Sequence, residues 1–153
     1  MRVVIFTIVV AVLVMGGLSP RAGDPLDLML SPEAAVHIQL RALQNNDVPS
    51  PDAGIRKAWA FAHPDNKRLT GPLPKFMAMI KQPAYAMLLN HQNHEIKLLE
   101  RSASIAVFAI RVTANDGLVY LCRWQVAPVS GGENDGAWLT IGVSPLMAVG
   151  KET

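Results

Sequence analysis

SPEAAVHIQLRALQNND, residues 31–47, and AWAFAHPDNKRLTGPLPKF, residues 58–76, decide how this chain folds. Ser31 has the side chain of a helix N-cap, and Pro32 takes the first helical position, where a proline costs no hydrogen bond. Apolar residues then follow the i, i+4, i+7 spacing of one helix face, at Val36, Leu40 and Leu43. The first segment therefore predicts an amphipathic helix that ends in the polar residues 45–47.

Two further helices are predicted from the same kind of spacing. One begins at Pro51–Asp52 and ends before Pro64, because the residue preceding a proline disfavours helical geometry. The other begins at Thr70–Pro72 and runs to Pro83. Their apolar positions fall at Ile55, Ala58, Trp59 and Ala62, and at Leu73, Phe76, Met77 and Ile80. Residues 65–68 between these two helices are expected to form a polar turn.

After Tyr85 the apolar period shortens from 3.6 to 2, which is typical of β-strands. Strands are expected at residues 95–100, 104–113, 118–126 and 138–143, the last of which ends the fold. The sequence Asn115-Asp116-Gly117 indicates a hairpin turn between the second and third strands. Helices followed by an antiparallel meander predict an α+β domain, with three N-terminal helices packed on the sheet.

The amino terminus carries a hydrophobic leader. Arg2 is followed by 16 uncharged residues, 3–18, which suit an export signal and fall just short of the ~17–25 residues of a membrane span. Residues 1–22 are therefore expected to be a cleaved signal peptide or a retained helix whose residues 3–18 anchor the chain in the membrane. Either one places the remainder outside the cytoplasm (periplasmic or extracellular), as a linker (23–30), an α+β domain (31–146) and a tail (147–153).

The charge balance argues against a polyanionic partner. The chain holds 14 Lys plus Arg and 12 Asp plus Glu, but Arg2 and Arg21 belong to the leader, so the rest is neutral apart from its four histidines. A nucleic-acid-binding domain would carry a basic patch instead. Cys122 is the only cysteine, so no disulfide can form within one chain. Its apolar strand neighbours predict that it is a small buried hydrophobe.

These segments are similar to those of one family. Residues 31–143, with SPEAAVHIQLRALQNND, the Asp52–Ile55 segment, FAHPDN, TGPLPKF and the Pro83-x-Tyr85 step, resemble the domain of unknown function 4864 family. The resemblance implies a nuclear transport factor 2-like (SnoaL-like) cone, in which the helices close over a curved sheet and leave a cavity. It implies no particular activity.

Some proteins with this cone are enzymes, among them ketosteroid isomerase, scytalone dehydratase and the polyketide cyclases. Their chemistry needs a carboxylate or a histidine that projects into the cavity. Here the expected strands 104–113 and 118–126 contain no Asp, Glu or His, and Arg111 and Arg123 are their only charged residues. A fold alone does not assign a function, and this composition disfavours a base-catalysed isomerase or dehydratase.

Large apolar side chains are the candidates for a ligand pocket: Trp59, Phe76, Met77, Tyr85 and Trp124. The same residues could form plain core, and a cone allows both at once. Asn66 and the Thr70–Pro72 segment could bond a ligand from the turn. The favoured interpretation is structural: Asn66 makes a side-chain turn, and Thr70 or Gly71 caps the third helix.

His91 and His94 have the His-x-x-His spacing of a metal-binding pair, with Glu95 beside them. No third ligand motif accompanies them, so an exposed polar loop is expected, with no metal and no cofactor. His91, with Tyr85 or Asp65, is the candidate acid or base of an alternative function, a small lyase, isomerase or hydrolase acting in the cone cavity.

The sequence thus predicts an exported or membrane-tethered domain that binds a small apolar molecule or a protein partner without catalysis. No nucleic acid is expected as a partner, and only the N-terminal segment is expected to contact the membrane. A retained leader would instead make the protein a tether or an assembly factor. A homodimer formed through the sheet would use Val119, Leu121, Trp138 or Ile141.

Overall fold

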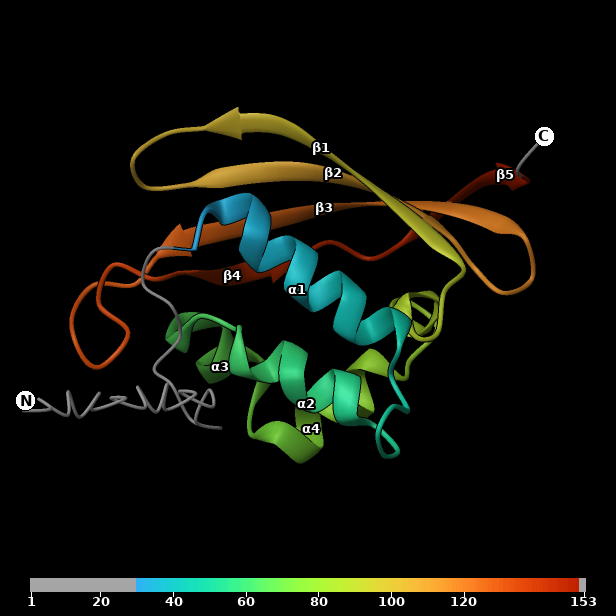
Figure 1. Cartoon of the computed structure of the whole chain (residues 1–153), viewed down its shortest axis with the longest axis horizontal. Helices are drawn as coiled ribbons and strands as arrows, with labels where there is room; N and C mark the ends of the chain where they lie inside the picture. Colours follow the sequence, from blue (N-terminus) through green and yellow to red (C-terminus); the bar gives the residue numbers. More distant parts are fainter. Residues whose placement is uncertain (1–29, 152–153) are drawn as a thin grey trace, which may run out of the picture.

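The computed structural model describes residues 30–151, so the predicted leader at residues 1–22 lies outside the described part of the chain. The described residues form an α+β domain in which helices cover one face of a five-stranded antiparallel sheet (Figure 1). The helical segments are α1 (Pro32–Gln44), α2 (Ala53–Ala60), α3 (Pro64–Thr70), α4 (Leu73–Ile80) and the 3-10 turn η1 (Ala86–Leu88). The strands are β1 (Asn93–Arg101), β2 (Ala106–Thr113), β3 (Leu118–Pro128), β4 (Trp138–Val143) and β5 (Met147–Lys151).

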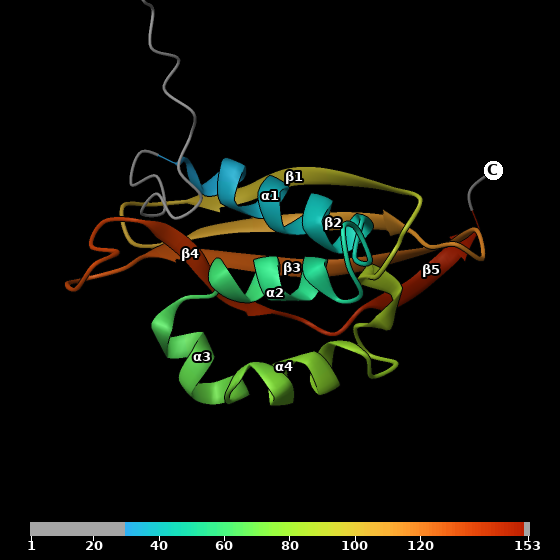
Figure 2. The ribbon, with the colours of Figure 1, turned by 60° about the horizontal axis from the view of Figure 1, so that its bottom comes forward.

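Helix α1 forms as predicted. The Ser31 side chain accepts a hydrogen bond from the backbone N–H of Ala34 at 3.1 Å, which satisfies one of the free donors at the helix start. The apolar face of the helix is fully buried. Helix α1 packs against β1, β3 and β4, α2 packs against α1 and α4, and α3 lies next to β4 (Figure 2).

The predicted polar turn at residues 65–68 is wrong, because these residues belong to helix α3. Pro64 begins this helix instead of merely ending the preceding one, and His63 is its N-cap, with Nδ1 accepting the Asp65 N–H at 3.1 Å. Gly71, at a φ of +81°, ends α3, and Pro72 then caps α4. Thr70 is the last residue of α3 and does not cap the next helix. Residues 30–151 therefore contain four α-helices where three were predicted for the domain.

The sheet order is β1-β2-β3-β4, and β5 also pairs with β3. The hairpin between β2 and β3 turns at Asn115–Gly117, as predicted. Strand β4 pairs with residues 124–128 of β3 and β5 with residues 118–121, so the two lie end to end along one edge. Strand β5 was not predicted, since residues 147–153 were expected to be a tail.

The edge breaks between β4 and β5 at residues 144–146. Ser144 donates its N–H to the Arg123 carbonyl at 2.9 Å, and its hydroxyl accepts the Arg123 N–H at 2.9 Å. Leu146 turns its N–H away from the sheet and donates it to the Ala84 carbonyl at 2.9 Å. The break therefore ties the sheet edge to the segment that joins α4 to η1.

Alternate residues of the two central strands form the core with the helices. The sheet contributes Ala106, Phe108, Ile110 and Val112 from β2 and Cys122, Trp124 and Val126 from β3. The helices contribute Val36, Leu40, Leu43, Ile55, Phe76 and Ile80. Cys122 is 5% exposed, and its burial raises the pKa of the thiol to about 12, which confirms that it behaves as a small buried hydrophobe.

Helices α1 and α2 are held together by their backbones at Gly54. Gly54 donates its N–H to the Asn46 carbonyl at 2.8 Å. The Asn46 side chain accepts the Ile55 N–H at 3.0 Å and donates to the carboxylates of Asp47 and Asp52 at 3.0 and 3.2 Å. A Cβ atom at Gly54 would lie 2.1 Å from the Ala42 carbonyl oxygen, so only glycine allows this close approach. Within residues 30–151, no helix combines the length and the apolar character needed to cross a membrane.

Candidate functional site

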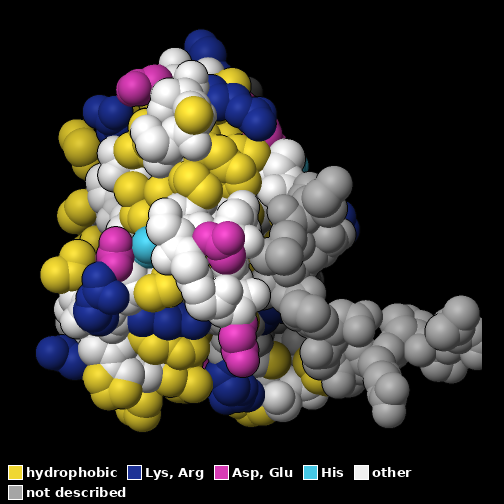
Figure 3. Space-filling model, turned by 90° about the vertical axis from the view of Figure 1, so that its left-hand side faces the viewer, with side chains coloured by type: hydrophobic (Ala, Val, Ile, Leu, Met, Phe, Trp, Pro, Cys, Tyr) yellow, Lys and Arg dark blue, Asp and Glu magenta, His cyan; other side chains and the backbone are white. Residues whose placement is uncertain are grey.

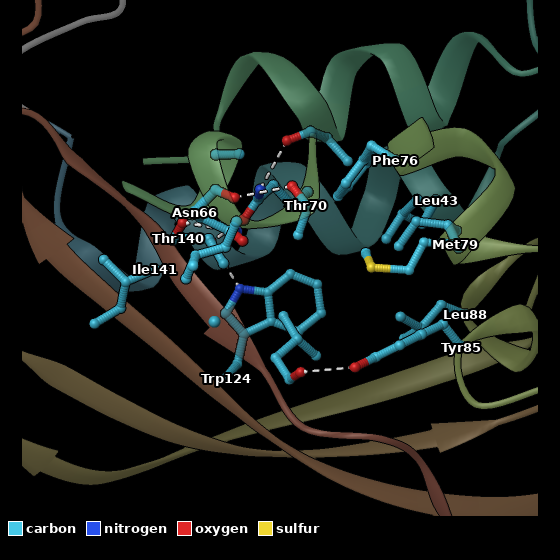
Figure 4. A pocket seen from close by; sticks show the side chains of 17 residues that line it. Leu43, Asn66, Thr70, Phe76, Met79, Tyr85, Leu88, Trp124, Thr140 and Ile141 are labelled. Carbon is cyan, nitrogen blue, oxygen red and sulfur yellow. Dashed lines mark hydrogen bonds between the residues drawn. The ribbon is translucent and has the colours of Figure 1, made fainter. Parts of the chain in front are cut away.

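A cavity of about 240 Å³ lies between the helices and the β4 side of the sheet (Figure 4). Its walls come from α1, α2, α3, α4, the η1 segment, β3 and β4. The lining residues are Gln39, Leu43, Ala58, Ala62, Asn66, Leu69, Thr70, Phe76, Met79, Ile80, Tyr85, Leu88, Trp124, Thr140, Ile141, Gly142 and Val143. None of these side chains carries a charge, so the cavity suits a neutral, largely apolar molecule.

The polar groups of the wall gather at one end, where Figure 4 shows Asn66, Thr70 and Thr140 close together. Thr140 is the centre of this group. Its hydroxyl accepts the Trp124 indole N–H at 2.8 Å and donates to the Gln39 side-chain oxygen. Gln39 in turn donates to the Ala58 carbonyl at 2.9 Å. The chain of bonds joins α1 and α2 to β3 and β4 across the core.

The Thr140 backbone anchors helix α3 to the sheet. Its carbonyl accepts the His63 N–H at 2.8 Å and the Asn66 side-chain N–H at 3.2 Å, while its own N–H bonds the Phe61 carbonyl at 2.9 Å. Thr70 donates its hydroxyl to the Asn66 carbonyl at 2.9 Å. These bonds place the polar face of α3 over the cavity although no residue of the helix is buried.

Tyr85 lies at the apolar end of the cavity, and Leu69 lies at the opening of the cavity to the surface. The Tyr85 hydroxyl donates to the Val143 carbonyl at 3.3 Å, close to the edge break. Figure 4 shows Tyr85 near Leu88 and Met79, in the apolar end of the cavity. Leu69 is 82% exposed although it lines the cavity, so the cavity reaches the surface beside the end of α3.

Three of the five predicted pocket residues, Phe76, Tyr85 and Trp124, line the cavity. Trp59 and Met77 do not line it and pack around the core instead. The Trp59 ring lies 5.0 Å from the Phe76 ring, with the Lys67 ammonium 5.3 Å from its centroid. Gln39 and Thr140 were not predicted, because nothing local in the sequence relates residues 101 positions apart.

The histidine pair was expected in an exposed loop, and that expectation is wrong for His91, which is 3% exposed. Its Nδ1–H donates to the Leu88 carbonyl at 2.7 Å, so its Nε2 accepts the Nδ1–H of His94 at 2.8 Å. Neither histidine lines the cavity. In residues 30–151 no group of three His, Cys, Asp or Glu side chains is placed to hold a metal ion.

Burial holds both rings neutral. Burial lowers the pKa of His91. The pKa of His94 falls to about 4, first because of burial and then because positive charge on His91, His37 or Arg41 would repel a proton on its ring. The His37 ring lies 6.3 Å from that of His94. A proton on the Nε2 of His91 would break the bond between the two rings, because both facing nitrogens would then carry hydrogens.

Stability is expected to fall as the pH drops from 7 to 5. The unfolded His94 takes up a proton near pH 6.5, whereas the folded one does so only near pH 4, so the unfolded chain binds more protons between these values. We expect a loss of about 1 kcal/mol, after a reduction for the partial exposure of His94. Urea unfolding at a series of pH values measures it. His94→Gln should flatten this dependence. His37→Gln should flatten it less, because it removes only one of the neighbouring groups that lower the pKa of His94. Equal slopes in all three proteins would contradict the assignment.

The residues predicted for a dimer interface do not share one face. Leu121 pairs with Met147 on the outer face of the sheet, where they are 42% and 70% exposed, and Val119 lies on the same face but is buried. Trp138 packs against the core and Ile141 lines the cavity. On the end of the molecule in Figure 3, basic and acidic side chains are interspersed among hydrophobic ones. A homodimer and the absence of nucleic-acid binding both stay predictions.

The chain matches one family model, described as "Domain of unknown function (DUF4864)", over residues 30–153. This match covers every element from α1 to β5 and confirms the family resemblance inferred from the motifs. No curated protein and no solved structure matches the chain.

Proposed function

The chain belongs to the domain of unknown function 4864 family, and we propose that its cavity binds a small, neutral, apolar molecule without catalysing a reaction. The observation that carries the proposal is the wall itself. It combines large apolar side chains with a few polar groups at one end, which is the usual composition of a small-molecule site. The lining side chains include no carboxylate, histidine, lysine or cysteine that could act as an acid, base or nucleophile.

We further propose that the domain is a nuclear transport factor 2-like cone. The support is the order of its elements, helices first and then an antiparallel meander, together with the position of the cavity between the two layers. For the location, we propose export or anchoring outside the cytoplasm. The support is the uncharged run at residues 3–18 after Arg2.

The size of the cavity limits the ligand. Apolar cavities of about 150 Å³ bind benzene, so 240 Å³ leaves room for about ten non-hydrogen atoms. This is smaller than the usual site for a drug-sized ligand, which measures about 300–1,000 Å³. A bicyclic hydrocarbon such as naphthalene is therefore a suitable probe.

Naphthalene is expected to bind the full-length protein inside the cavity. In NMR spectra it should shift the indole N–H signal of Trp124, which lines the cavity, and leave that of Trp138 in place. At ten times its dissociation constant it should raise the free energy of unfolding by about 1.4 kcal/mol.

A matched pair of variants locates the binding. Ala58 lines the cavity and Ala60 is exposed on the same helix. Ala58→Leu should fill part of the cavity and weaken naphthalene binding at least tenfold, while Ala60→Leu should leave it unchanged. Binding that is absent at saturating naphthalene, or equal in both variants, would show that the cavity is not the site.

A further inference from the structure

We propose that helix α3 is the gate of the cavity, and that a small apolar ligand enters and leaves when α3 detaches locally from β4 while the rest of the domain stays folded. This inference rests on the proposed function and goes beyond it by assigning the route of the ligand. It follows from the way in which α3 is attached to the domain.

Helix α3 belongs to the cavity wall but contributes nothing to the core. Asn66, Leu69 and Thr70 line the cavity, and the exposed Leu69 lies at its opening. No residue of α3 is buried, whereas each of the other helical segments in the wall contributes at least one buried residue. Displacing any of those segments would carry its own buried side chains into water, and displacing α3 would not. Helix α3 is therefore the helical part of the wall that opens at the lowest cost in free energy.

The contacts that hold α3 in place are weak ones. Its main packing partners are β4 and α4 (Figure 2). The Asn66 side chain donates to the Thr140 carbonyl at 3.2 Å, and the Lys67 ammonium lies 5.3 Å from the centre of the Trp59 ring on α2. A neutral hydrogen bond and a cation–π contact each contribute about 1 kcal/mol, far less than the cost of unfolding a domain.

Both ends of α3 limit the opening to residues 64–71. His63, just before the helix, is 8% exposed and donates its N–H to the Thr140 carbonyl at 2.8 Å, so the chain up to this point stays on the sheet. Gly71, just after it, has a φ of +81°, and glycine changes its backbone angles at little steric cost. Helix α4 then returns the chain to the core through its buried residues. A helix of seven residues is not stable by itself, so α3 is expected to lose its helical hydrogen bonds when it detaches.

Hydrogen exchange of the full-length protein without ligand tests whether α3 opens. The backbone amides of residues 67–70 in α3 should exchange at least about tenfold faster than those of residues 77–80 in α4, because α4 opens only when its buried side chains leave the core. Helix α4 is a suitable reference, since it is also short and lines the same cavity. Equal exchange in the two helices would overturn the gate.

Lys67→Gln and Arg68→Gln form a matched pair for the route of the ligand, since each removes one positive charge from α3. Lys67 contacts Trp59 on α2 and does not line the cavity, whereas Arg68 pairs with Asp65 inside α3. Lys67→Gln should raise the rates of naphthalene binding and release by one common factor of about two to five, and leave Kd unchanged. It should speed the hydrogen exchange of α3 by the same factor. Arg68→Gln should change these rates by less than about twofold.

The rates are measured by NMR exchange between the free and bound signals of the Trp124 indole N–H. If naphthalene binds and Lys67→Gln leaves both of its rates unchanged, the ligand uses another route, so the gate is refuted while the proposed function stands. If naphthalene does not bind the unmodified protein at saturating concentration, the proposed function fails, and the inference fails with it.

Discussion

Gly54→Ala is expected to lower the free energy of unfolding by about 3 kcal/mol or more. The added Cβ would lie 2.1 Å from the Ala42 carbonyl oxygen and 2.7 Å from the Asn46 Cα, and both are backbone atoms that cannot rotate away. Extra atoms in a tightly packed site usually cost about 1–3 kcal/mol, and a backbone clash of this size lies at the upper end. The roughly 1 kcal/mol gained by alanine over glycine in a helix offsets only part of this cost.

The consequence reaches beyond the two helices. Moving α2 away from α1 would break the Gly54–Asn46 and Ile55–Asn46 bonds and then the contact of Gln39 with Ala58. Urea unfolding followed by circular dichroism measures the loss. Gly142→Ala is the matched control, since a Cβ there meets only the Gln125 side chain at 3.7 Å, and it should change stability by less than about 0.5 kcal/mol. Similar stabilities for the two variants would disprove the close-packing argument.

Thr140→Val is expected to cost about 3 kcal/mol although it preserves the shape of the side chain. The indole N–H of Trp124 would lose its acceptor and the side-chain oxygen of Gln39 would lose its donor, with Trp124 only 2% and Gln39 only 3% exposed. Each buried polar group left without a partner costs about 1–3 kcal/mol. Thermal or urea unfolding gives the value directly.

Two comparisons show whether the network is the cause. Thr70→Val removes a half-buried hydroxyl that bonds only its own helix, so it should cost less than about 1 kcal/mol. Combining Thr140→Val with Gln39→Leu should cost clearly less than the sum of the single changes, because the two side chains share one bond. Strict additivity would mean that the hydroxyl acts alone.

Local patterns in the sequence were sufficient for α1, for the β2–β3 hairpin and for β4, which runs over Trp138–Val143 as predicted. Helix α3 was missed because Pro64 was interpreted only as the end of the preceding helix. The signal was present, since His63-Pro64-Asp65 repeats the arrangement of Ser31-Pro32-Glu33, an N-cap followed by a proline and an acid. Strand β5 left no comparable trace, because every residue in it is exposed and its apolar residues do not alternate.

The site could be predicted only as far as its apolar part. Phe76, Tyr85 and Trp124 were found because large apolar side chains mark a core or a pocket in any sequence. The network around Thr140 depends on α1 and β4 meeting in space, and no spacing in the chain indicates that meeting. The burial of His91 likewise follows from tertiary packing, since its sequence neighbours are polar.

The break at residues 144–146 also bears on self-association of the folded protein. An unbroken strand along the 11 residues of β3 would leave a long row of free backbone groups on which another chain could pair. Here two short strands, β4 of six residues and β5 of five, occupy that edge of β3 one after the other and do not form one continuous strand. The opposite edge, β1, carries a bulge between Leu98 and Glu100 and charged side chains along its length. Both edges thus resist strand addition, and the protein is expected to remain free of amyloid-like aggregates at high concentration.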